Sequence, residues 1–426
     1  MLLDPAAITR LPPPPARGSD TEAGEINKLV SLTRRQRDPR TAEAIRFWSA
    51  GASVRWNEIA RDLVAHHRTP PPQASRVYAL LSVAVYDALV SVWNNKYFYD
   101  RPMPSVVASE LAPVGALPGY PSYPSAHAAV AAASASVLSF LYPDQAEDLG
   151  SRAAAHQESR LAAGLHFRSD MLAGETLGRS VAGLVIEHAR KDRSDAVWTG
   201  QLRTGPGVWP CAPGQSPDGV RWGEVKPWLM KAAADHRAPP PPPFDSGVFR
   251  AALAEVKRLS DTRTREQERT AALWADGVGS YTPPGRWNKI ACDLVLQHQA
   301  SELRAARALA LLNAAVMDAG ITCWETKYHY MVIRPSQVDP GITTPVGLPN
   351  FPSYTSAHAA FSGAASAVLG GLFPGAAASL TASAEEAAFS RVLGGIHYRF
   401  DGDAGLTQGR SVAQLALQRA REDGAS

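Results

Sequence analysis

The stretch Phe351-Pro352-Ser353-Tyr354-Thr355-Ser356-Ala357-His358 leads into a run of small residues, 359–372, which predicts a helix that begins near Ser356. Serine is a preferred residue at the N-cap position, and the next amide, that of Ala357, then points out of the positive end of the helix. Such a helix end binds oxyanions through its free N–H groups. The stretch therefore predicts an anion-binding position, with His358 beside it for proton transfer.

Three basic residues accompany this stretch in two separate segments. Lys327 and Arg334 are seven residues apart, which on a regular helix is about 20° from two full turns, so we expect them to share a face. Arg391 supplies a guanidinium that can bind an oxyanion through two N–H groups. Trp324 and Tyr328 flank Lys327 and are expected to form a wall. Three cations, a hydroxyl and a backbone N–H suit a doubly or triply charged tetrahedral anion.

The remaining polar residues fit acid–base or nucleophilic chemistry. Asp401 follows His397 by one helical turn, where it can fix the tautomer of the ring and make the other ring nitrogen a better ligand or nucleophile. Asp318 lies in an apolar helix, so its carboxylate needs a partner, and we expect one of the arginines. Any one of these residues alone is more often structural, and a His–Asp pair four apart can be only a helix pair. The combination of three separated segments favours a site.

The whole pattern occurs twice at a constant offset of 231 residues (358 − 127 and 401 − 170), which indicates an internal duplication. The first copy is expected to carry Asp87, Lys96, Arg101, Ser125, Ala126, His127, Arg160, His166 and Asp170. There the lysine and the arginine are five apart, about 140° away from a shared helical face. We therefore expect the second copy to be the main site, and the first to be a weaker site or a structural half.

The chain contains helical patterns and few strand signals, which predicts an all-α protein of two pseudo-symmetric helical bundles packed together. Helices are expected over 76–93, 128–141 and 170–189. We expect four regions, namely a Pro-rich and charged extended arm at 1–40, a first bundle at 41–192, a Trp-, Gly- and Pro-rich linker at 193–265, and a second bundle with the main site at 266–426.

Composition limits the classes of partner and compartment. The 426 residues carry a net charge of only +3, which gives no reason to expect nucleic acid or a membrane surface as a partner. The three cysteines form no C-x-x-C pair, so neither a disulfide framework nor a zinc site is expected. No apolar run reaches the ~18–20 residues of a membrane span. We expect a soluble protein, cytoplasmic as the sequence stands and secreted or periplasmic if a leader was removed, and a homodimer is compatible with the sequence.

The motifs resemble those of the superfamily that joins type 2 phosphatidic acid phosphatases, bacterial acid phosphatases and vanadium-dependent haloperoxidases. The pattern of that superfamily is K-x6-R-P, then P-S-G-H, then S-R-x5-H-x3-D. The resemblance is greatest to the bacterial haloperoxidase-like branch, on residues 308–335, the linker and the approach at 351–354. The chain departs from the pattern by Ala126 and Ala357 in place of glycine and by Thr355 in place of proline.

The resemblance implies a vanadate cofactor, and phosphate can occupy the same site. The vanadium would be bound by His397 (and by His166 if the first copy is functional), and the oxyanion would be held by Lys327, Arg334, Ser356, Ala357 and Arg391. His358 would be the acid–base residue, and Phe351 and Trp324 would lie in the halide and substrate pocket. The reactants would be hydrogen peroxide, halide and a small organic acceptor.

The same residues also fit a soluble acid phosphatase acting on phosphate monoesters. His397 would then attack phosphorus to form a phosphohistidine, and His358 would protonate the leaving alcohol. Because phosphate and vanadate share one geometry, the sequence leaves both activities open.

Overall fold

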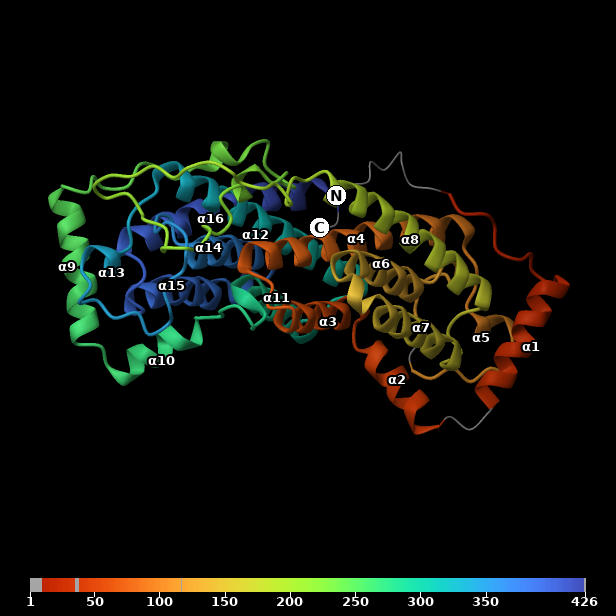
Figure 1. Cartoon of the computed structure of the whole chain (residues 1–426). Helices are drawn as coiled ribbons and strands as arrows, with labels where there is room; N and C mark the ends of the chain where they lie inside the picture. The colour runs from red at the N-terminus through yellow and green to blue at the C-terminus, as the bar shows by residue number, and fades with distance from the viewer. Residues whose placement is uncertain (1–9, 35–37, 116, 425–426) are drawn as a thin grey trace. The chain divides into compact units, whose positions relative to one another are not determined.

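The computed structural model describes residues 10–34, 38–115 and 117–424, and the regular secondary structure of this part of the chain consists of helices joined by loops (Figure 1). Within it, β pairing is limited to two isolated bridges, between Val208 and Val332 and between Val278 and Ser280. The prediction of an all-α fold is confirmed. The three cysteines are free.

The helices repeat in the same order in the two halves of the sequence. The first set is α3 Ala52–His66, α4 Pro71–Tyr99, α5 Pro104–Val107, α6 Ala126–Leu141, α7 Ala146–Ala162 and α8 Arg168–Arg190. The second set is α11 Thr282–Gln297, α12 Glu302–Tyr330, α13 Pro335–Val338, α14 Ala357–Leu372, α15 Ala377–Leu393 and α16 Arg399–Glu422. Corresponding helices from α4 onward start 231 residues apart (302 − 71 and 357 − 126), which agrees with the internal duplication.

The chain forms two compact units, and these do not follow the two repeats. Unit 1 comprises 1–63, 80–189 and 295–310, and unit 2 comprises 64–79, 190–294 and 311–426. A short piece of each repeat thus belongs to the unit formed mainly by the other repeat, which differs from the boundaries expected at 192 and 265. Two of the boundaries, after 79 and after 310, lie within the 29-residue helices α4 and α12, which at about 1.5 Å per residue are roughly 44 Å long.

The segment expected to be an extended arm is largely helical. Helix α1 (Asp20–Arg34) buries Leu29 and Val30 against Leu161 and Met171, and it packs on α7. Helix α2 (Pro39–Ser49) follows and also packs on α7. The extended-arm prediction is therefore wrong for these residues, because the charged segment has an apolar side that the first bundle covers. The parts of the arm at 1–9 and 35–37 lie outside the described residues.

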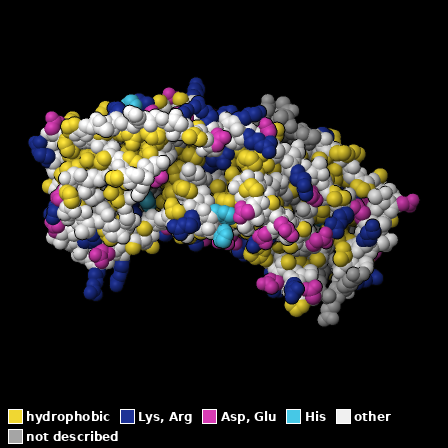
Figure 2. Space-filling view, viewed as in Figure 1, with side chains coloured by type: hydrophobic (Ala, Val, Ile, Leu, Met, Phe, Trp, Pro, Cys, Tyr) yellow, Lys and Arg dark blue, Asp and Glu magenta, His cyan; other side chains and the backbone are white. Residues whose placement is uncertain are grey.

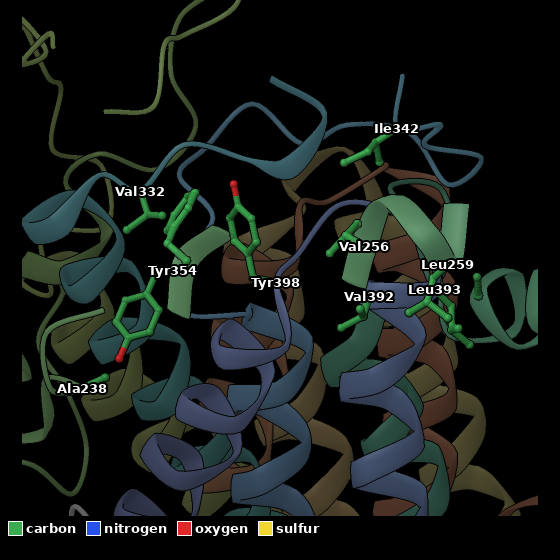
Figure 3. Packing of buried hydrophobic residues seen from close by; sticks show 11 residues of the cluster. Ala238, Val256, Leu259, Val332, Ile342, Tyr354, Val392, Leu393 and Tyr398 are labelled. Carbon is green, nitrogen blue, oxygen red and sulfur yellow. The ribbon is translucent and has the colours of Figure 1, made fainter. Parts of the chain in front are cut away.

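The linker is mostly irregular but ends in a helix. It contains only the short turns η3 (Trp222–Glu224) and η4 (Ala233–His236) before helix α9 (Gly247–Asp261) begins at the N-cap Ser246. Phe249, Val256 and Leu259 of α9 are buried in a core cluster with residues of α15 and of the start of α16. Figure 3 shows Val256 and Leu259 beside Val392 and Leu393 of α15. The last part of the expected linker, together with α10 (Arg265–Leu273), is thus part of the unit 2 helical body.

Glycines let α16 lie directly against α14. A Cβ atom on Gly409 would be 2.1 Å from the carbonyl oxygen of Ala360, and one on Gly405 would be 2.7 Å from that of Ser356. The same close packing recurs in unit 1, where a Cβ atom on Gly178 would be 2.3 Å from the carbonyl oxygen of Ala129. This close approach brings the first turns of α16 to the first turn of α14, where the predicted site lies.

Two helices, α4 and α12, are long and apolar enough to span a membrane by length and composition. Their most apolar windows are 83% and 94% buried within the structure, as in core helices of a soluble protein. On the face shown in Figure 2, Lys and Arg side chains are interspersed with Asp and Glu side chains, which matches the small net charge.

The glycine contact predicts a specific loss of stability. Gly409→Ala is expected to lower the free energy of unfolding by about 3 kcal/mol, because its Cβ has no room between two helix backbones. Gly183→Ala in α8, with open space around it, is the control and is expected to raise stability by about 0.5–1 kcal/mol. Urea denaturation of both variants measures the difference. Equal stability of the two would contradict the close packing.

Candidate active site

The first turn of α14 provides a buried hydroxyl group that has no protein partner. Ser356 is the N-cap residue, and its N–H donates to the carbonyl of Asp401 over 2.9 Å. Its side chain makes no capping hydrogen bond, and among the described residues its Oγ finds no partner although it is buried. In the first repeat, Ser125 Oγ does cap its helix, accepting from the Ala128 N–H over 3.3 Å. Ser356 Oγ and the Ala357 N–H are therefore free to donate to an anion.

Lys327 lies near the end of α12 and is fully buried. Its Nζ donates to the carbonyls of Pro352 and Ser353, each over 2.8 Å, and to that of Thr355. Burial lowers the pKa of Lys327 to about 7. The loop that precedes α14 therefore wraps this ammonium group with neutral carbonyl oxygens.

Arg334 does not lie on the same helix as Lys327, so the predicted shared helical face is wrong. Helix α12 ends at Tyr330, Met331 has a positive φ of 54°, and Arg334 is the extended residue before α13. The turn nevertheless directs Arg334 to the same loop, where Nε donates to Phe351 O over 2.9 Å. The Lys327 ammonium and the Arg334 guanidinium each lie 5.0 Å from the centre of the Phe351 ring.

Arg391 reaches the site from the last turns of α15. Its Nε donates to Ser390 Oγ over 2.9 Å, and its guanidinium also donates to the carbonyl of Ala271. All hydrogen-bond partners of Lys327, Arg334 and Arg391 found among the described residues are neutral. Buried charges of one sign are costly unless an opposite charge compensates them. The arrangement therefore fits an anion as the missing partner.

His397 is oriented by a carboxylate, as the sequence predicts. Its Nδ1 lies 2.9 Å from Asp401 Oδ2, an oxygen that also accepts from Ser353 Oγ over 2.5 Å and from the Tyr398 N–H over 3.1 Å. Nδ1 is thus the protonated nitrogen, and Nε2 keeps its lone pair. Burial raises the pKa of Asp401 to about 6, although the bond from Ser353 opposes the rise.

Burial and nearby positive charge keep both histidines neutral. The pKa of His397 is lowered well below its usual value by burial first, then by Arg334, Lys327, His358 and Arg391. Arg334 also donates to the carbonyl of Ile396, the residue that precedes His397, over 2.7 Å. Burial also lowers the pKa of His358, whose Nε2 lies 3.2 Å from the carbonyl oxygen of Ala275.

A cavity of about 460 Å³ opens beside these residues, entirely within unit 2. Arg391 and His358 line it, together with Trp324, Phe351 and Ile396. Trp324 and Phe351 contact each other with ring centroids 5.1 Å apart. The structure thus places both residues of the expected substrate pocket beside the candidate acid–base histidine.

Asp318 does not pair with an arginine, so that prediction is wrong. Its carboxylate accepts hydrogen bonds from the backbone N–H groups of Trp228, Leu229 and Met230 over 2.7–3.1 Å. Burial raises its pKa to about 6. Asp318 therefore anchors the linker onto α12 and has no contact with the basic cluster among its described partners.

The first repeat differs in the partners of its arginine. Arg101 donates to Asp170 Oδ1 over 2.8 Å and also forms ion pairs with Glu25 and Glu22 of α1, at 3.2 and 3.7 Å. The shorter spacing from Lys96 places Arg101 one residue beyond a positive φ at Asp100, after α4 has ended. Carboxylates thus neutralise Arg101, whereas the hydrogen-bond partners of Arg334 among the described residues are carbonyl groups.

Its histidines are also less well arranged for chemistry. His166 Nδ1 is 3.7 Å from Asp170, and His127 Nδ1 faces His156 Nε2 at 2.9 Å. The other residues predicted for this copy are hydrogen-bonded within the protein or buried. Lys96 donates to two carbonyls, Arg160 to Ser49 Oγ and Ile45 O, Ser125 caps α6, Ala126 begins α6, and Asp87 is buried in α4. These contacts support the second copy as the main site.

A polar network behind Lys327 is not predicted by the sequence motifs. Thr355, which replaces the proline of the motif, donates to Gln408 Oε1 over 2.7 Å, and Gln408 Nε2 donates to Thr326 Oγ1 over 2.8 Å. The carbonyl of Thr355 in turn accepts from Lys327. Gln408 follows Asp401 by seven residues on α16, a spacing that puts both on the buried face of the helix. A polar residue at this spacing is a signal in the sequence that could have identified Gln408.

Gln408 is expected to position the loop that holds Lys327. Gln408→Leu, which copies Leu177 of the first repeat, leaves the buried Thr355 hydroxyl without its acceptor. We expect roughly fivefold weaker sulfate binding by calorimetry, with recovery in the double variant that adds Thr355→Pro to match Pro124. Gln418→Leu, at an exposed position of the same helix, is the control. Unchanged binding in Gln408→Leu would exclude a positioning role.

The low pKa of Lys327 predicts a pH-dependent affinity. The charged form binds anions and is populated below about pH 7, so binding falls as pH rises through that value. We expect sulfate, whose charge is constant, to bind about tenfold more weakly at pH 8 than at pH 6. The Lys327→Met variant is expected to bind weakly with a flat profile. A flat profile in the unaltered protein would show that Lys327 does not titrate in this range.

Comparison with known proteins agrees with the geometry. The chain is similar in structure to a bacterial vanadium-dependent iodoperoxidase, with a TM-score of 0.69 and 25% identity over 86% of this chain and 95% of that one. It also resembles a holo-type bacterial vanadium-dependent chloroperoxidase, at a TM-score of 0.62 and 15% identity over 83% and 92% of the two chains. No curated protein sequence matches. Residues 76–193 and 307–424, more than half of the chain, match the PAP2 superfamily, and the protein belongs to this superfamily.

Proposed function

We propose that the protein is a vanadium-dependent haloperoxidase that uses hydrogen peroxide to oxidise halide at the second-repeat site. The observation that carries the proposal is the set of three buried cations, Lys327, Arg334 and Arg391, whose hydrogen-bond partners among the described residues are all neutral. The similarity in structure to bacterial vanadium-dependent peroxidases supports vanadate over other tetrahedral anions.

The donor set fits vanadate. The three cations compensate its charge, while the unpartnered Ser356 Oγ and the Ala357 N–H at the start of α14 offer two further donors. His397 Nε2, whose lone pair is free because Nδ1 faces Asp401, is the candidate vanadium ligand. Bound vanadate supplies the activation of hydrogen peroxide toward halide.

His358 is the candidate for proton transfer. Its Nε2 donates to the carbonyl of Ala275, which leaves Nδ1 as an acceptor. Its lowered pKa keeps the ring neutral, so Nδ1 can take a proton from a reactant in the cavity and later return it. Trp324 and Phe351 cover the neighbouring cavity wall and limit water there.

Reconstitution with vanadate tests the proposal. Protein loaded with vanadate and supplied with peroxide and iodide, bromide or chloride is expected to halogenate a phenolic dye, which absorbance detects. The unloaded protein and a phosphate-loaded sample are controls, because phosphate has the same shape but cannot carry out the redox chemistry. Hydrolysis of a chromogenic phosphate ester without any halogenation would replace the proposal by the phosphatase activity.

The two repeats are expected to differ in their effect on activity. His397→Ala should lower kcat by more than about 100-fold, because it removes the candidate vanadium ligand. His166→Ala is the matched change in the first repeat, where Asp170 is engaged by Arg101, and a small loss is expected. Equal losses would mean two equivalent sites, and a larger loss from His166→Ala would reverse their order.

A further inference from the structure

The cavity beside the site has a polar floor, aromatic walls and an acidic rim. Arg391 and Ile396 at its base are almost fully buried, whereas Val278 and Leu348 at its mouth are 45% and 43% exposed. Trp324, Phe351 and Pro72 provide flat apolar surfaces between these levels. A volume of about 460 Å³ lies within the range of pockets that hold small organic molecules.

One acidic residue at this rim, Asp218, has a firmly held backbone. The backbone of Asp218 is fixed by three hydrogen bonds, because its carbonyl accepts from Trp324 Nε1 over 3.3 Å and from the Tyr328 hydroxyl over 2.6 Å, while its N–H donates to Asn350 O over 3.0 Å. Gly219 permits this packing, since a Cβ there would be 2.5 Å from the Trp324 indole nitrogen.

The Asp218 side chain lines the cavity, and within the described part of the chain no donor or cation contacts its carboxylate. Asp218 is exposed on the side of the solvent, but partial burial raises the pKa of its carboxyl group, whereas the pKa of Glu224 is lowered first by a hydrogen bond from Arg221. A fixed backbone thus presents an acceptor group at the edge of the cavity.

We propose that the cavity binds a phenol, with its aromatic ring between Trp324, Phe351 and Pro72 and its hydroxyl donating to the carboxylate of Asp218. The walls favour a flat apolar ring over a flexible polar ligand. The buried cations near the floor disfavour a cationic ligand, so the donor is a neutral hydroxyl group and not an ammonium group. Halogenation of the bound phenol rests on the proposed function. Binding of the phenol to the cavity does not depend on that function.

Direct binding separates this inference from the proposed function. Isothermal titration of the full chain, without vanadate, halide or peroxide, compares 4-propylphenol with its methyl ether, which lacks the donor. We expect the phenol to bind roughly fivefold tighter, because a hydrogen bond to a charged acceptor is stronger than one to a neutral group. If the phenol binds but vanadate-loaded protein does not halogenate, this inference stands and only the proposed peroxidase activity is overturned. If the protein halogenates but does not bind the phenol, the proposed function stands and this inference is overturned.

Variants assign the preference to Asp218. Asp218→Ala is expected to bind phenol and ether equally, and Asp218→Asn, which keeps a neutral acceptor, to retain part of the preference. Asp195→Ala removes another exposed carboxylate of the same linker and is expected to change nothing. Leu348→Trp, which fills the mouth, is expected to weaken both ligands. Circular dichroism verifies the fold of each variant.

Three results would overturn the inference. Equal affinity of the unaltered protein for the phenol and its ether would remove the role of Asp218. Tighter binding of phenethylammonium than of the phenol would change the ligand class to a cation. Failure of both aromatic compounds to bind at millimolar concentration would show that the cavity is not a subsite for an aromatic ring.

Discussion

An uncompensated positive charge in the interior of unit 2 is the constraint on which the rest of the site depends. Lys327, Arg334 and Arg391 are almost completely buried, yet the groups that hold them are backbone carbonyls and a serine hydroxyl. Carbonyl dipoles orient a cation without cancelling its charge, so the site remains positive and selects an anion. Burial lowers the pKa of all three groups because it removes the water that would solvate their charge, and the nearby carboxylates Asp401 and Asp276 oppose this shift only in part.

The fold supports this charge by bringing short segments together from distant parts of the sequence. The carbonyls of the loop at 351–355 contact both Lys327 and Arg334, and Arg334 also donates to Ile396 O over 2.7 Å. Gly405 and Gly409 allow α16 to approach α14 so closely that the carbonyl of Asp401 bonds to the N–H of Ser356. The orienting carboxylate and the anion-binding helix end are therefore one structural unit, and a shift in helix packing would alter both.

The sequence predicts the helical class, the duplication and the identity of the clustered residues, because motif spacing and helical periodicity are local properties. It does not predict how Arg334 reaches the site, since the left-handed residue Met331 ends α12 four residues after Lys327. It also misassigns Asp318, whose partners are backbone amides of the linker and leave no trace in side-chain patterns. Contacts between a side chain and a segment far away in the sequence depend on tertiary packing. The hydrogen bond between Thr355 and Gln408 is another contact of this type.

The comparison of the two repeats shows how a site can lose its charge while keeping its motif. Arg101 fills the arginine position of the motif but stands two residues earlier than Arg334, whose counterpart at the N-cap before α5 is Met103. From this earlier position Arg101 pairs with Asp170, and α1 adds Glu25 and Glu22. The pKa of Asp170 is lowered although burial acts to raise it, because His166 first and then Arg101 stabilise the carboxylate, and His166 Nδ1 lies 3.7 Å from it. Burial instead raises the pKa of Asp401, which lies 2.9 Å from His397 Nδ1. A carboxylate that neutralises an arginine is less available to orient a histidine, and an arginine that has been neutralised no longer attracts an oxyanion. One change in spacing therefore weakens both halves of the site, and the nearly complete motif of the first repeat is compatible with a structural role.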